Sequence, residues 1–386
     1  MPAALDPTYP LHPIGCLLAA LMLLCVMLTS FIRQKWNRGV AFLCFWLFFE
    51  NLTLGIDGII WADNADVKLY VYCDIVSHVQ LIAYVVKPMA ILIITRRLYL
   101  MTRLQPVRLP GSSAERWDLL FEWLLGVVIP IVVAGPLYYI VQALRFKITG
   151  GYGCQDVVDI SVLGILLVHS WALTPSLISI CFYYPRAVLA LYRHGRDRNR
   201  FLQNSDSTSR INYIRILILA SLDILLTFPI GITTIVFTIG NYLSLGPLPF
   251  YSGWTYVHME WEPEGNILPP TATGPFGVLD AVPYYFNQWT SPVLAYVIFA
   301  LFGVTSEARA SYWQLVDVVG GRLGLSASLF GKMGDRAEDM SFHAKTGELP
   351  SFVDADIHLA EQGVQRESES AQDRLEDGRE SSTVPE

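Results

Sequence analysis

Charged residues are scarce in this sequence, and those present are unevenly distributed. Only 16% of the 386 residues are Asp, Glu, Lys or Arg, whereas 53% are hydrophobic and the mean hydropathy is +0.41. So little charge excludes an ordinary soluble protein of this length and indicates a polytopic membrane protein. The acidic excess of residues 351–386 equals the net charge of −7, so the rest of the chain is neutral overall. We expect no nucleic-acid partner.

The motifs of several enzyme and metalloprotein classes are also missing. The six cysteines show no CxxC spacing and no clustering with histidine, so no metal site is predicted. Neither Gly-x-Gly-Asp nor His-Glu-x-x-His occurs, which argues against an intramembrane enzyme. The last apolar run contains no lysine for a Schiff base, which disfavours an opsin or a light-driven pump. We therefore predict neither catalysis nor a cofactor.

Seven apolar runs are present instead, each about as long as the 20 or so residues that cross a bilayer as a helix. The acidic leader before the first run has no Lys or Arg, unlike a signal peptide, so this run is interpreted as a retained span. The fold class predicted is an all-α membrane protein, a seven-transmembrane helix bundle within residues 14–302. The predicted spans are 14–32, 40–61, 71–95, 119–139, 162–184, 214–239 and 284–302.

The basic residues of the connections predict the orientation of these spans. Fifteen Lys and Arg residues lie in the first, third and fifth connections, against Lys68, Arg145 and Lys147 in the others. Because Lys and Arg resist translocation, residues 1–13 are predicted to be extracellular and the C-terminus cytosolic. Cys73 and Cys154 then both lie on the oxidising side, where either a disulfide or two free thiols would be compatible with the sequence.

Three ionisable residues, Glu50, Lys87 and Asp223, lie at depths within their spans where their side chains could meet. Ionisable groups in a bilayer are costly and are usually paired or functional. Our hypothesis is that Lys87 pairs with Asp223 or Glu50 and that the pair restrains the resting state. The alternatives are a purely structural pair and a lysine that extends to the inner surface. Pro229, shortly after Asp223, predicts a kink that would let the inner half of span six swing.

Polar and aromatic residues towards the outer ends of the spans suggest a ligand cavity. Each is equally well explained by a hydrogen bond between helices. The sixth connection, residues 240–283, is long and rich in proline and aromatic residues, which favours an ordered outer cap. The residues proposed for the cavity are Asp57, Trp61, His78, Gln80, His169, Trp254, His258, Asn287 and Gln288.

The chain after the last span changes character twice. Ala308, Tyr312, Leu315 and Val319 recur at helical spacing, which predicts a short amphipathic helix on the inner leaflet within residues 303–320. Residues 321–386 are polar and acidic, so they are predicted to form a disordered cytosolic tail. No cysteine follows Cys181, so no palmitoylation site is expected there.

A series of short motifs runs through residues 14–313. In their order and spacing they resemble the fungal a-factor-type mating-pheromone receptors, a branch of the G-protein-coupled receptors separate from the rhodopsin-like one. The motifs are Trp36-Asn37, Asn51, Trp61, Cys73-Asp74-Ile75, Arg96-Arg97-Leu98-Tyr99, Arg145-Phe146, Tyr152-Gly153-Cys154-Gln155, Arg215, Leu222-Asp223-Ile224, Pro229, Trp254, Val257-His258, Trp289, Ala295-Tyr296, Phe299, Phe302-Gly303, Glu307-Ala308 and Tyr312.

This resemblance implies a plasma-membrane receptor, embedded in membrane lipids, for a short peptide pheromone farnesylated at a C-terminal cysteine. It implies activation of a heterotrimeric G protein in the mating pathway and a disulfide between Cys73 and Cys154. Whether the receptor forms a homodimer is left open. The resemblance also places candidate G-protein contacts at the cytosolic ends, at Arg96, Arg97, Tyr99, Arg193, Arg196 and Arg198.

The chain departs from two expectations. It lacks the Asp-Arg-Tyr and Asn-Pro-x-x-Tyr motifs of rhodopsin-like receptors, and Asp57 stands where an asparagine is expected in the family. The alternative from another class is a multi-pass transporter or channel, with Glu50, Asp57, Lys87 and Asp223 as an ion relay. Against it, the sequence shows no internal repeat of the kind that such folds usually contain.

Overall fold

The computed structural model describes residues 5–33, 37–103, 112–189, 207–243, 248–259, 261–267, 281–305 and 308–312. All of these belong to one compact unit, Met1–Tyr312. Arg193, Arg196 and Arg198 lie outside the described residues, as do residues 313–320 of the predicted surface helix and the predicted tail.

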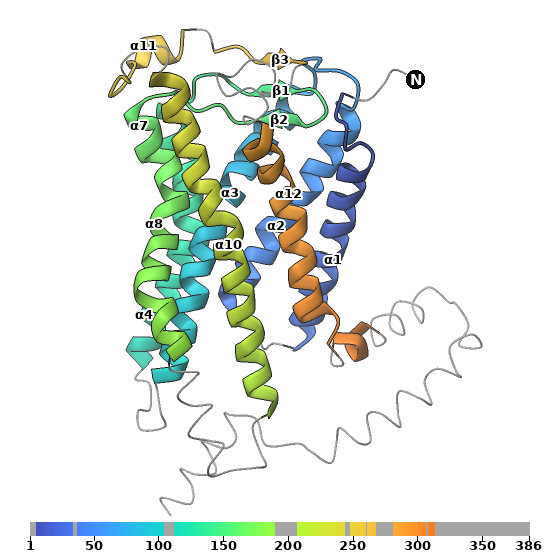
Figure 1. Cartoon of the computed structure of the whole chain (residues 1–386), viewed down its shortest axis with the longest axis vertical. Helices are drawn as coiled ribbons and strands as arrows, with labels where there is room; N and C mark the ends of the chain where they lie inside the picture. The colour runs from blue at the N-terminus through green and yellow to red at the C-terminus, as the bar shows by residue number, and fades with distance from the viewer. Residues whose placement is uncertain are drawn as a thin grey trace, which may run out of the picture. The chain divides into compact units, whose positions relative to one another are not determined.

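Helices dominate the described part of the chain (Figure 1). The first three spans and the sixth are single helices, whereas the fourth and fifth alternate between α-helix and π-helix. The elements are α1 (Leu11–Arg33), α2 (Arg38–Ile60), α3 (Tyr70–Arg103), α4 (Ser112–Trp123), η1 (Leu124–Val128), α5 (Ile129–Val132), η2 (Val133–Leu137), α6 (Tyr138–Ile140), α7 (Val162–Gly164), η3 (Ile165–His169), α8 (Ser170–Ile178), η4 (Ser179–Tyr183), α10 (Ser207–Leu243), α11 (Trp254–Val257), α12 (Ala281–Ile298) and η7 (Phe299–Gly303).

Six helical segments of the described chain are long and apolar enough to cross a membrane, and they correspond to the first six predicted spans. A further helix, α12 continued by η7, covers the seventh predicted span and packs against α1, α2 and α10. The chain is therefore a helical membrane protein. The six segments are Leu11–Ser30, Arg38–Ile60, Tyr70–Leu100, Arg116–Ile140, Val162–Leu189 and Ile214–Val236.

Proline accompanies the irregular helical turns of spans four and five. Pro130 lies in α5 between two π-helical segments, Pro136 lies within η2, and Pro175 lies in α8 between η3 and η4. A proline has no N–H to donate and its ring crowds the preceding turn, so the helix cannot keep its regular hydrogen bonds there. Proline alone does not explain these short segments, because α3, α10 and α12 each continue as an α-helix through Pro88, Pro229 and Pro292.

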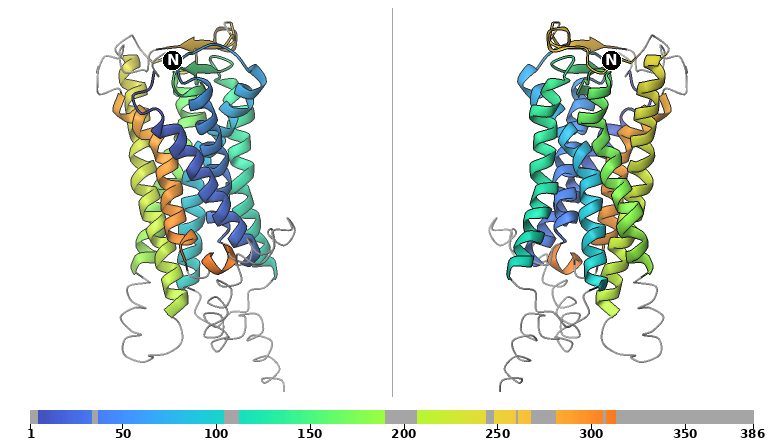
Figure 2. Two further views of the ribbon diagram at one scale, coloured as in Figure 1. Left: turned by 90° about the vertical axis from the view of Figure 1, so that its right-hand side faces the viewer. Right: turned by 90° about the vertical axis from the view of Figure 1, so that its left-hand side faces the viewer.

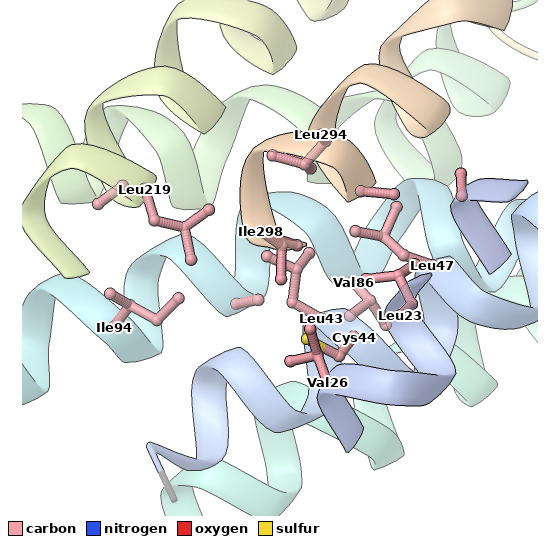
Figure 3. Packing of buried hydrophobic residues seen from close by; sticks show 14 residues of the cluster. Leu23, Val26, Leu43, Cys44, Leu47, Val86, Ile94, Leu219, Leu294 and Ile298 are labelled. Carbon is pink, nitrogen blue, oxygen red and sulfur yellow. The ribbon is translucent and has the colours of Figure 1, made fainter. Parts of the chain in front are cut away.

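The largest apolar core lies where α1, α2, α3, α10 and α12 meet (Figure 3). Leu23, Leu43, Val86, Leu219 and Leu294 contribute one buried side chain from each of these five helices. Small buried residues in the same cluster let the helix backbones approach closely, which favours packing in lipid. This core fixes the three helices that carry the polar site described below.

A small sheet covers one end of the bundle (Figure 2). Strands β1 (Lys147–Thr149) and β2 (Gly153–Gln155) form an antiparallel hairpin, and β3 (Glu264–Asn266) pairs with β1 in parallel. Gly151 and Gly153 have φ angles of 86° and 77°, which glycine adopts without the strain that a Cβ would cause. The predicted all-α fold did not include this sheet. The cap predicted for the sixth connection takes the form of β3 and α11 within the described residues.

Candidate functional site

A buried ion pair lies in the interior of the bundle. Lys87 Nζ donates a hydrogen bond to Glu50 Oε1 at 2.8 Å, and the two side chains are 7% and 10% exposed. Ser291 Oγ donates to the second carboxylate oxygen, Glu50 Oε2, at 3.0 Å. Asn51 Nδ2 in turn donates to Ser291 Oγ at 2.9 Å. The network therefore joins α2, α3 and α12.

Of the two partners proposed for Lys87, Glu50 is in contact with it. Asp223 lies in α10, but its side chain lies outside the described residues. A buried pair such as this one is stable only when the remaining lone pairs are also satisfied. Ser291 satisfies one of them, a role that the sequence did not indicate.

A cavity of about 260 Å³ adjoins the ion pair. Its lining comes from α2, α3, η3, α10 and α12, from β2 and from the loop that follows β2. Of the residues predicted for a ligand cavity, Gln80, His169, Asn287 and Gln288 line it. The described residues of the lining are Glu50, Leu54, Gln80, Leu81, Tyr84, Lys87, Gln155, Asp156, His169, Thr234, Asn287 and Gln288.

Two other residues predicted for the cavity, Asp57 and Trp61, lie beneath the hairpin instead. Tyr72 donates its hydroxyl hydrogen to Asp57 Oδ1 at 2.8 Å, and Gln80 Nε2 lies 3.5 Å from Oδ2. Trp61 is fully buried, and its Nε1 donates to the backbone oxygen of Asp66 at 3.0 Å. Asp57 is thus bonded to α3 and Trp61 to the loop that follows α2, and neither side chain lines this cavity.

The remaining three predicted cavity residues also have local roles in the structure. His78 Nδ1 lies 2.7 Å from the backbone oxygen of Asp74, one helical turn earlier. His258 stacks on Trp254 with ring centroids 4.1 Å apart, and its Nε2 lies 3.1 Å from the backbone oxygen of Tyr139. Trp254 is 51% exposed. The Trp254 and His258 pair therefore belongs to an aromatic cluster outside the cavity.

The disulfide between Cys73 and Cys154 is present, with the two Cα atoms 5.3 Å apart. It connects the start of α3 to β2. Beside it, Arg145 donates two hydrogen bonds to the Asp74 carboxylate, from Nε to Oδ1 at 2.9 Å and from Nη2 to Oδ2 at 2.5 Å. The hairpin is thus fixed to α3 by one covalent bond and by a bidentate ion pair.

Asp156 was not among the predicted residues, although its position close to Cys154 in the sequence could have indicated it. It follows Cys154 by two residues, so a disulfide to the start of span three necessarily holds it above the bundle. Burial raises the pKa of its carboxyl group from 3.8 to about 6, and contacts with its own backbone and with His78 oppose that shift. The side chain keeps some accessible surface because it lines the cavity.

The raised pKa of Asp156 predicts a pH-dependent stability. A carboxyl group whose pKa is higher in the folded than in the unfolded state stabilises the fold most at pH values below its unfolded pKa, near 4. This stabilisation is lost as the pH rises through about 6. We expect the thermal midpoint of the protein in lipid nanodiscs to fall over that window, by the equivalent of about 3 kcal/mol. Asp156→Asn should abolish most of the fall. An identical pH profile in the variant would contradict this assignment, and His78→Gln controls for the neighbouring imidazole.

At the opposite end of the bundle, two of the predicted G-protein contacts bind α4. Arg96 forms an ion pair with Asp118 and lies over the Phe121 ring, 4.5 Å from its centroid. Arg97 Nη1 lies 3.9 Å from Glu122 Oε1.

Glu122 is the centre of this second polar network. Arg38 Nη1 donates to Glu122 Oε2 at 2.8 Å, and the Glu122 side chain is only 5% exposed. Tyr99, also predicted as a contact, packs edge-on against Tyr183 with centroids 5.9 Å apart. The ends of spans two, three and four that lie opposite the sheet are therefore linked by charges.

Comparison with known proteins gives a consistent result. The sequence profile of one family, described as Pheromone A receptor (STE3), matches residues 12–320. The Pheromone B alpha 2 receptor of Schizophyllum commune is 28% identical over 309 residues, covering 80% of this chain and 46% of that protein. Pheromone receptor 1 of Ustilago hordei is 28% identical, covering 74% of this chain and 77% of that protein.

A more distant relative is the Pheromone a factor receptor of Saccharomyces cerevisiae, which is 24% identical over 84% of this chain and 65% of its own length. The chain spans less than half the length of the three Schizophyllum commune B alpha receptors that it matches, at 46%, 47% and 43%. The similarity therefore covers the helical part of this chain and only a portion of those longer proteins.

Proposed function

The chain belongs to the Pheromone A receptor family, and from that membership we propose that it is a receptor for a peptide mating pheromone that activates a heterotrimeric G protein. The observation that carries the proposal is the family match over residues 12–320, which includes every described helix except the first residue of α1. This is a family of receptors and not of enzymes. The match also disfavours the transporter or channel alternative.

We propose that α12 and η7 form the seventh span and that the N-terminus is extracellular in the plasma membrane. The packing of α12 against α1, α2 and α10 supports the seventh span. The orientation is supported by the disulfide at the sheet end and by the basic residues at the other end. Residues 303–320 would then lie on the inner leaflet and residues 321–386 in the cytosol.

We propose further that the ligand is farnesylated and divided between two environments. Amides, carboxyl groups and an ammonium group line the cavity, which suits the peptide part of such a ligand. Burying a farnesyl chain there would leave those polar groups without hydrogen-bond partners, which is unfavourable. The farnesyl group would instead stay in contact with membrane lipids.

The network of Lys87, Glu50 and Ser291 is proposed to restrain the resting state. It connects three helices through charged and polar groups that cannot separate without leaving a charge unpaired in a low-dielectric interior. A ligand in the adjoining cavity would compete for Lys87 or Glu50 directly, since both line it. Activation would then consist of exchanging one set of polar contacts for another.

The experiment that tests the function is guanine-nucleotide exchange on a fungal heterotrimeric G protein, with this receptor in lipid nanodiscs. A panel of synthetic farnesylated peptides is compared with the same peptides lacking the lipid. Exchange with a lipidated peptide only is the expected result. If well-folded receptor responds to no peptide, the ligand assignment is wrong, and ion flux through the same nanodiscs or liposomes is measured next.

The inner charge network gives a prediction for G-protein coupling. Glu122→Gln should raise ligand-free nucleotide exchange severalfold, because it releases Arg38 and Arg97 from α4 with a loss of about 1–2 kcal/mol of resting-state stability. Asp118→Asn is the matched control, since its pair with Arg96 is 45% exposed on the acid side and contributes little. Equal ligand-free exchange in Glu122→Gln and the parent would show that the network has no role in restraint.

A further inference from the structure

Asp156 is a half-buried acid without a cationic partner among the described residues. Its carboxylate is hydrogen-bonded to its own backbone, and the one base that acts on it electrostatically is His78. No hydrogen bond joins His78 to Asp156 in the described part of the chain, and His78 Nδ1 is directed to the backbone oxygen of Asp74. An unpaired carboxylate in such a place is unfavourable for folding and therefore indicates a function.

The charges of the cavity lining do not balance. Among the residues that the structure describes, the lining contains two acids, Glu50 and Asp156, and one ammonium group, that of Lys87. Lys87 Nζ lies 2.8 Å from Glu50 Oε1, so these two charges form an ion pair and neutralise each other. The cavity is left with one negative charge, and a low-dielectric interior strengthens its attraction for a cation.

Asp156 is also held rigidly on both sides. Cys154, two residues earlier, is bonded to Cys73. On the other side the Val157 N–H donates to the Tyr138 hydroxyl oxygen at 2.9 Å, and the Ala143 N–H donates to the Val157 backbone oxygen at 3.2 Å. A charge fixed in position before binding needs no ordering when a partner arrives, which favours affinity and selectivity.

We propose that Asp156 is a specificity-determining residue, the counter-ion for a positively charged group of the peptide ligand. That group is the peptide's amino terminus or the side chain of a lysine or arginine. The amides of Gln80, Asn287 and Gln288 line the same cavity and supply hydrogen bonds to the peptide around the charge. This inference rests on the proposed function, because it assigns a ligand group to the cavity of that receptor.

The test begins with farnesylated peptides that trigger nucleotide exchange. If none does, the proposed function fails and the charge assignment is not reached. Each active peptide is then neutralised at one cation at a time, by N-terminal acetylation, by glutamine for lysine or by citrulline for arginine. Potency is measured on the parent, on Asp156→Asn, and on Asp66→Asn, an exposed outer acid that serves as the matched control.

Neutralising one particular cation should reduce potency on the parent and on Asp66→Asn by about tenfold or more, and on Asp156→Asn by less than about twofold. Such coupling identifies both the ligand group and its partner. The inference is overturned if Asp156→Asn weakens charged and neutralised peptides equally, or if an active peptide carries no cation. Binding of a fluorescent active peptide to the same nanodiscs separates a change in recognition from a change in signalling.

Discussion

Lys87→Met should unfold at a markedly lower temperature than the parent receptor and should exchange nucleotide faster without ligand. Methionine keeps much of the length of the lysine side chain but leaves the Glu50 carboxylate buried without its ammonium partner. Removing one partner of a buried pair costs roughly 3–5 kcal/mol. Because the same contact links α2 to α3, its loss also weakens the resting arrangement of the helices.

The double variant Glu50→Gln with Lys87→Met separates the two effects. It removes both charges, so most of the stability should return, while the restraint between the helices stays lost. Lys68→Met is the control for removing a lysine elsewhere, since Lys68 lies in the outer loop where its Nζ contacts Asn64. If the folded Lys87→Met receptor has the parent's ligand-free exchange rate, the pair is only structural.

The second large effect is expected at the disulfide. The bond closes a stretch with a sequence separation of 81, and its removal should lower the free energy of unfolding by about 4 kcal/mol. The double variant Cys73→Ala with Cys154→Ala should also lose most of its response to peptide, since the segment that carries Asp156 is then no longer fixed to α3. Thermal unfolding and nucleotide exchange in nanodiscs measure both losses.

The exposed cysteine of span five provides the control for this experiment. Cys181→Ser changes a free thiol and should leave stability and response unchanged. Treating the parent with reductant should reproduce the double variant. A reductant-treated parent that keeps its thermal midpoint, with the bond demonstrably broken, would show that the hydrogen bonds of the sheet and Arg145 hold the hairpin unaided.

The helices themselves follow closely from the sequence because hydropathy is a local property. The second predicted span, residues 40–61, differs from α2 by two residues at the start and one at the end. The third differs more, since α3 continues from the predicted end at residue 95 to Arg103. Arg96 and Arg97 end the apolar run but are good helix formers, so the helix extends beyond the apolar segment.

The site could be predicted only in part, because sequence fixes the height of a residue in its span but not the direction of its side chain. Glu50 and Asp223 were equally plausible partners for Lys87 for this reason. Asp57 was placed in the cavity, but the hairpin covers it, and a Cβ on Gly153 would lie 2.5 Å from the Asp57 Cβ. The pairing of β1 with β3 joins segments more than 100 residues apart, and no local pattern encodes it.

The chain that follows α10 is held at the sheet end of the bundle by two backbone hydrogen bonds. The N–H groups of Val162 and Leu163 donate to the backbone oxygens of Pro249 and Phe250 at 3.1 and 2.9 Å, six and seven residues after α10 ends at Leu243. We infer that α10 can tilt more easily at its far end than at the sheet end. With 37 residues it is about 55 Å long, so a tilt of about 5° moves its far end by roughly 5 Å. A tilt of α10 small enough to keep these two hydrogen bonds would therefore displace its far end by nearly the pitch of one helical turn.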